Sequence, residues 1–210
     1  MKNYLFSIMI FFITIINAQP NITQPYDGLL LFSPTGMGGG GGSNQSYLMD
    51  IELNILHTWS HSNGAASMPY LLQDSTIIYP YRVSNPTMTS GGVGGGIMHI
   101  NWDGTILWNH VISNTSFQHH HDVEPLPNGN VLVIAWENKS STEAYSLGRQ
   151  SIDNPLNQMW SEAIFELQPN GNGGVDIVWE WHLWDHLIQD VNPALPNYAV
   201  ISDHPEQLDI

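Results

Sequence analysis

The feature that most constrains the fold is a pattern repeated three times along the chain. Each copy has an apolar run, a turn with Asn, Asp or Gly, and a second apolar run ending on tryptophan, at Tyr47–Trp59, Ile97–Trp108 and Ala163–Trp179. Short apolar runs separated by such turns are typical of antiparallel hairpins. A second apolar element, Met68–Tyr79 and Asp122–Val133, follows the first two copies. The repeat therefore spans about 50 residues and four strands, the usual size of a propeller blade. The sequence predicts an all-β fold made of β-propeller blades.

The length of the chain limits the number of such blades. A six-bladed propeller with this repeat would need about 270 residues or more, whereas the chain has 210. We therefore expect about three to four blades of six, and the front portion of a longer protein. The polar segment Asn138–Trp160 is predicted to be an insertion between the second and third copies.

The N-terminus is predicted to be a signal peptide. Lys2 supplies a positive charge, the apolar run Leu5–Ile16 follows it, and Ala18 offers a small residue for cleavage. The alternative is an uncleaved membrane anchor, but the run is shorter than the ~20 residues that span a bilayer. We expect residues 1–18 to be removed and residues 19–210 to form an exported, incomplete propeller.

Charge and cysteine content exclude several classes of function. The chain has 4 Lys and Arg against 19 Asp and Glu, a formal charge of −15, and no cysteine. Because nucleic-acid binding depends on cations that neutralise phosphates, a nucleic-acid partner is not expected. Without cysteine, disulfides, thiolate metal sites and a thiol nucleophile are all excluded.

Two glycine-rich runs, Gly38–Gly42 and Gly91–Gly96, each precede a hairpin of the repeat. The first overlaps a literal G-x-G-x-x-G sequence, Gly36–Gly41, but a dinucleotide site needs a strand before it and a helix after it. Because a strand is expected to follow, we interpret both runs as flexible connections that use the conformational freedom of glycine.

The strongest candidate site is His119-His120-His121-Asp122. The equivalent positions of the other repeat hold Ala65, Ala66, Ser67 and Met68, so the fold itself does not need the imidazoles. Alternation along a strand would place His119 and His121 on one face and His120 and Asp122 on the other. Two of these side chains could then point into a central channel, and Asp122 could accept from an imidazole N–H and fix its tautomer.

Other histidines give weaker signals. His182–Asp190 resembles a helical turn more than a strand, and a helix would bring His182 and His186 to a spacing that suits one metal ion. A packing role for this pair is favoured because no third ligand can be named. A second metal hypothesis combines His119, His121 and Asp122, since imidazole suits zinc or copper.

Three ordered motifs together resemble the arylsulfotransferase (aryl-sulfate sulfotransferase) family. The segment Tyr26–Pro34 is similar to the opening of the family's first blade, and His120–Leu132 is similar to its H-H-D-x-x-x-L-P-N-G-N stretch. Trp184–Asp190 and Asp203–Glu206 are similar to the W-D-H-L-x-Q-D and D-H-P-E segments of the exported bacterial branch. The resemblance covers nearly all of the predicted mature chain.

The resemblance implies a six-bladed propeller in the periplasm or outside the cell. Its active site, in the central channel, transfers a sulfuryl group from an aryl sulfate to a phenol through a sulfated histidine, without a cofactor. The family's histidine of the H-H-D stretch falls on His120 or His121, with Asp122 in support. The family's H-x-N segment, active-site arginine and sulfated histidine lie downstream of the matched region. We therefore expect the 210-residue chain to be inactive alone. The main alternative is a non-catalytic propeller that binds a ligand or partner, because propellers serve both uses.

Overall fold

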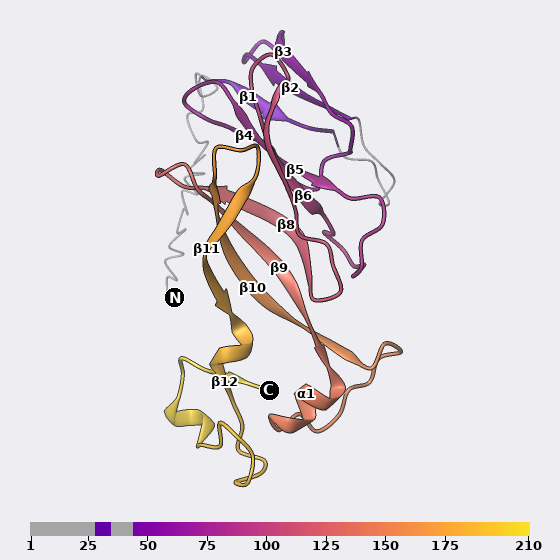
Figure 1. Ribbon diagram of the computed structural model, residues 1–210, viewed down its shortest axis with the longest axis vertical. Helices are drawn as coiled ribbons and strands as arrows, with labels where there is room; N and C mark the ends of the chain where they lie inside the picture. Colours follow the sequence, from indigo (N-terminus) through magenta and orange to yellow (C-terminus); the bar gives the residue numbers. More distant parts are fainter. Residues whose placement is uncertain (1–27, 35–43) are drawn as a thin grey trace, which may run out of the picture.

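A computed structural model describes residues 28–34 and 44–210 of the protein (Figure 1). The predicted signal peptide at residues 1–18 and the first glycine run lie outside these ranges. Within them, no helix is long and apolar enough to cross a membrane.

The described residues form three antiparallel sheets, each built from strands that are consecutive in sequence, so the all-β prediction is confirmed. The first sheet contains β1 (Leu30–Phe32), β2 (Gln45–Met49) and β3 (Ile55–Ser60). The second contains β4 (Tyr70–Leu71), β5 (Ile77–Arg82), β6 (Gly95–Ile100) and β7 (Ile106–Val111). The third contains β8 (Phe117–Pro125), β9 (Val131–Ser140), β10 (Gln158–Pro169) and β11 (Val175–His182).

Each of the last two repeated hairpins joins the apolar element that precedes it in the sequence. Thus Met68–Tyr79 supplies β4 and the start of β5, which join the hairpin β6–β7, and Asp122–Val133 overlaps β8 and β9, which join β10–β11. Four consecutive antiparallel strands are the arrangement of a propeller blade. The three sheets do not form a closed ring within the described residues, and the number of blades stays a prediction.

The sheets are held together by two apolar cores. Tyr79, Tyr81 and Met98 of the second sheet pack with Leu48 and Trp59 of the first. The opposite face of the second sheet packs on the third; this core contains Ile78, Ile97, Trp108, Val131, Val133, Ala135, Ala163, Phe165 and Leu167. Because the second sheet is covered on both sides, β5 is apolar and buried along nearly its whole length.

The tryptophans that end the hairpins differ in environment. Trp59 is 1% exposed and Trp108 is 4% exposed, as expected for core residues, but Trp179 is 47% exposed. The three hairpin tryptophans therefore do not share one environment, and Trp179 is a surface residue. Trp179 lies on β11. No further sheet of the described residues covers this strand, whereas the second sheet covers Trp59.

The segments outside the meanders are short. The insertion contains the helix α1 (Ser141–Ser146), which begins with a capping box between Ser140 and Glu143. The predicted helical turn is confirmed only in part, since His182 ends β11 and a 3₁₀ helix, η2, spans Leu183–His186. The strands β12 (Leu187–Ile188) and β13 (Leu208–Asp209) pair in parallel, and a second 3₁₀ helix, η3 (Ile201–Asp203), lies between them in sequence.

Candidate functional site

The histidine cluster lies in a wide bulge of β8, the edge strand of the third sheet. His119 pairs with Ala135 and Val123 pairs with Val133, so the three residues between them oppose a single residue of β9. His121 takes a positive φ of 54° inside this bulge. The expected alternation of side chains along the strand is therefore wrong here, because a bulge changes the direction of the residues that it contains.

A loop of the second sheet runs beside the bulge. The N–H of Gly94 donates to the carbonyl of His119 over 3.1 Å, and the N–H of His121 donates to the carbonyl of Gly92 over 2.6 Å. Between these two bonds, Val93 and His120 form an antiparallel bridge. The bulge is thus fixed on one side by β9 and on the other by the connection between β5 and β6.

This contact explains the second glycine run better than loop flexibility does. A Cβ atom at Gly92 would overlap the ring of His121, and a Cβ at Gly94 would lie 2.5 Å from Nδ1 of His119. Gly95 and Gly96 are buried residues of β6 rather than loop residues. Glycine is required here because imidazole rings and backbone approach each other closely.

His119 is an interior residue of this cluster. Its side chain is fully buried, and its Nδ1 accepts a hydrogen bond from the N–H of Gly95 over 3.0 Å. Burial, together with the neighbouring imidazole of His120, lowers the pKa of His119 to about 4. The ring is therefore neutral near pH 7, and it stabilises the position of the bulge rather than contacting solvent.

His120 is buried but linked to two other polar side chains. Its ring stacks on Trp136 with 4.4 Å between centroids and is only 4% exposed. Nε2 of His120 lies 2.8 Å from a carboxylate oxygen of Glu162, and its Nδ1 lies 2.7 Å from Nδ1 of His121. His121 is exposed, so the bulge presents one accessible imidazole backed by a buried one.

Asp122 does not contact an imidazole through its carboxylate, contrary to the sequence-based expectation. Its two oxygens accept hydrogen bonds from the hydroxyl groups of Ser67, over 3.1 Å, and Tyr70, over 2.9 Å. Burial and the hydrogen bond to this carboxylate raise the pKa of Tyr70 to about 12. The physical reason for the difference is the bulge, which directs Asp122 toward the second sheet. Asp122 therefore links two sheets.

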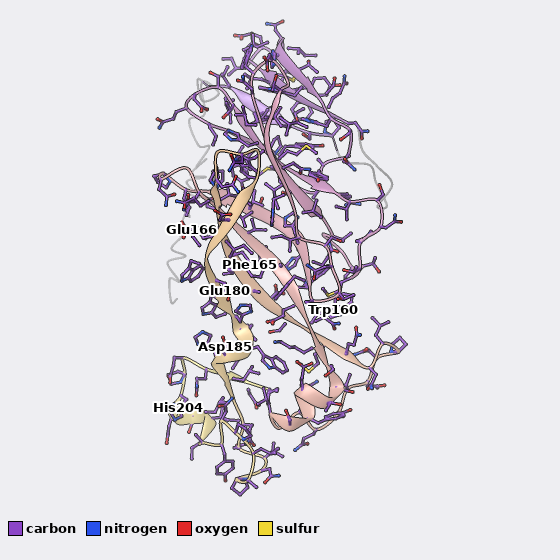
Figure 2. The ribbon with its side chains drawn as sticks, in the orientation of Figure 1. Trp160, Phe165, Glu166, Glu180, Asp185 and His204 are labelled. Carbon is purple, nitrogen blue, oxygen red and sulfur yellow. The ribbon has the colours of Figure 1, made fainter. Side chains whose placement is uncertain are left out.

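The acidic partner of the imidazoles is instead Glu162 of β10, which the sequence did not indicate. It is 42 residues away from His120 in the chain, and its side chain is 37% exposed. Glu166 lies on the same strand four residues further on, where it accepts from Asn128 and Asn130. Glu166 and Trp160 mark the two ends of this part of β10 in Figure 2. The sequence signal for Glu162 was limited to two glutamates, Glu162 and Glu166, within the strand-like run Ser161–Leu167.

An open groove lies next to the bulge and runs along β8, β9 and β10. Its lining is mostly apolar and consists of Asp122, Val123, Glu124, Leu132, Val133, Ile134 and Ile164. The groove can therefore hold an apolar molecule beside Asp122, the last residue of the bulge.

Neither metal hypothesis is supported by the geometry. Among the residues that the structure describes, no three His, Asp or Glu side chains are placed to hold one metal ion. Nδ1 of His182 lies 3.0 Å from Glu137, whereas His186 stacks on Trp181 with 4.9 Å between centroids. These two histidines have separate packing roles because the strand β11 ends between them.

No protein-family model matches the chain, and no curated protein matches it.

Proposed function

We propose that this chain is part of an arylsulfotransferase-like enzyme that transfers a sulfuryl group from an aryl sulfate to a phenol. The observation that carries the proposal is the pair His120 and His121, one buried and one exposed, at the edge strand of a four-stranded meander. In a propeller, blades surround a central channel, and such edge strands can line it. One of the three motifs that resemble the family contains this pair.

The chemistry of the reaction fits an imidazole at this position. A phenol that attacks sulfur must lose its proton, and histidine is the side chain most often used to accept one. The groove beside the bulge is lined mainly by apolar side chains, which suits an aromatic ring. The sulfated histidine implied by the resemblance would be supplied by sequence downstream of the matched motifs.

Export is part of the same proposal. The apolar run Leu5–Ile16 after Lys2 supports a cleaved signal peptide, and the resemblance to the exported bacterial branch supports the periplasm or secretion. Detecting a mature N-terminus at Gln19 in the exported protein would test this part.

The test of activity is transfer from 4-nitrophenyl sulfate to phenol by the product of the complete reading frame. We expect phenyl sulfate to form, and the variants His120→Ala and His121→Ala to lose about 100-fold or more of the rate, the usual size of a general acid–base contribution. His204→Ala, at a half-buried histidine outside the bulge whose Nδ1 hydrogen-bonds Glu206, is the matched control and should keep the rate. An active enzyme in which both site variants retain full activity would contradict the proposal.

The 210-residue chain by itself is expected to be inactive. Turnover by this chain that the double variant His120→Ala/His121→Ala loses would contradict that expectation and would place the whole reaction within the 210 residues.

A binding propeller without catalysis is the second candidate. It is favoured by Asp122, which is engaged in hydrogen bonds that join two sheets rather than directed at a ligand. The same assay distinguishes the two functions, since a binding protein would take up the aryl sulfate without releasing 4-nitrophenol.

A further inference from the structure

We infer that Nε2 of His121 is the proton-accepting atom of this site, and that Glu162, acting through His120, is the positioning residue that keeps this atom unprotonated. The inference deepens the proposed function and rests on it, because it specifies the role of each residue in the same reaction. It follows from the hydrogen bonds that join Glu162, His120 and His121.

The direction of each hydrogen bond is determined by the groups involved. A carboxylate only accepts hydrogen bonds, so Nε2 of His120 must carry the proton that it shares with Glu162 over 2.8 Å. A neutral imidazole has a single N–H, and Nδ1 of His120 is then an acceptor. The two Nδ1 atoms are 2.7 Å apart and can share only one proton, which therefore belongs to His121.

The neutral form of His121 is thus the Nδ1–H tautomer, and its Nε2 carries a free electron pair. The ring of His121 is held in place by the loop before β6. Its own backbone N–H is bonded to Gly92, and the ring packs on the α-carbon of that glycine. His121 is exposed, so the free Nε2 belongs to the one imidazole of the bulge that a substrate can reach.

The same chain of bonds can move a proton away from the substrate. When the O–H bond of a phenol breaks, the proton joins Nε2 of His121 and the electron pair stays on the phenol oxygen. That oxygen forms the new bond to sulfur, while the bond from sulfur to its carrier breaks and the carrier keeps the electron pair. The Nδ1 proton of His121 can then pass to His120, whose positive charge is stabilised by Glu162.

The burial of His120 strengthens the hydrogen bonds that its ring makes to Glu162 and His121. The side chain of His120 is 5% exposed and is covered by Trp136, so its hydrogen bonds do not compete with water. Glu162 is more exposed, at 37%, and contacts solvent as well as His120.

The first test is nitrogen-15 NMR of the imidazole rings in the labelled 210-residue chain at pH 8.5. We expect His121 as the Nδ1–H tautomer and His120 as the Nε2–H tautomer. In Glu162→Ala the acceptor is lost, and the His121 signals should shift toward the Nε2–H tautomer. Glu162→Gln can still accept through its amide oxygen, so it should restore the wild-type tautomer. Glu166→Ala, on the same face of β10, is the matched control and should leave the His121 signals unchanged.

The second test is transfer by the complete protein. Glu162→Ala should lose about ten-fold or more in kcat with little change in KM, and Glu162→Gln should lie between it and wild type because it keeps the acceptor without the charge. A wild-type His121 in the Nε2–H form would overturn the inference, as would an active enzyme whose kcat is the same in Glu162→Ala. The expected tautomers without any transfer by the complete protein would instead overturn the proposed function, and with it the catalytic role of His121.

Discussion

Replacing His119 with asparagine is expected to remove a defined part of the protein's sensitivity to mild acid. The native ring is fully buried, and burial lowers its pKa from 6.5 to about 4. In the unfolded chain the group titrates near 6.5, so between these pH values the unfolded state binds a proton that the native state does not. The stabilising contribution of the neutral ring is therefore complete above pH 6.5 and is lost as the pH falls toward 4.

The magnitude follows from the two pKa values. At ~1.36 kcal/mol for each pKa unit, the difference between 6.5 and about 4 is worth about 3 kcal/mol when the pH is below 4. About 2 kcal/mol of this is already lost between pH 7 and pH 5. Asparagine offers an amide oxygen where histidine has Nδ1, so the N–H of Gly95 keeps an acceptor, but the amide takes up no proton.

Urea unfolding followed by tryptophan fluorescence at pH 7 and pH 5 measures this effect. Between the two pH values, wild type should lose about 2 kcal/mol more of its unfolding free energy than His119→Asn does. Any cost of the smaller side chain that does not depend on pH cancels in this comparison. The pH-dependent contribution of His61, whose pKa burial also lowers to about 4, cancels as well because both proteins contain this residue. If the two proteins lost the same free energy between pH 7 and pH 5, the reasoning about His119 would be refuted.

Three further outcomes can be measured. Gly96→Ala would push a methyl group into the buried ring of Tyr81 and should lower the unfolding free energy by about 1–3 kcal/mol in urea denaturation. Tyr70→Phe removes the hydroxyl that donates to Asp122 and should lower the unfolding free energy by about 1 kcal/mol or more. In an alkaline titration followed at 295 nm, this variant should also lack the absorbance change of the phenol that ionises near pH 12. Ser140→Ala removes the capping box of α1 and should cost about 1 kcal/mol, detected as a lower midpoint of thermal unfolding.

The sequence predicted the strands of this protein well because their signals are local. Turn residues such as Gly129, which has a positive φ of 87°, end one apolar run and allow the next to return alongside it. The repeat also indicated four strands for each unit. It could not indicate where one sheet ends and the next begins, because a period has no starting point. In the structure the breaks fall after β3 and after β7.

The sequence indicated which residues form the imidazole cluster but not how their side chains are arranged. The stretch from His119 to Asp122 stood out because its repeat counterpart has no imidazoles. Its side-chain directions were mispredicted because a bulge of β8 interrupts the alternation, and the bulge depends on pairing with β9 and with the loop before β6. Glu162 was missed because no property of a glutamate 42 residues away indicates that it will meet His120.

The amino-acid sequence by itself determined the all-β character, the repeated strands and the position of the imidazole cluster, since each of these follows from the order of apolar, turn and ionisable residues over short distances. Tertiary structure alone decided that His119 is interior, that His120 is bound to Glu162 and that His121 is accessible. These properties arise when β8 is paired on both sides, which brings Gly92, Gly94 and β10 against rings that are far from them in the chain.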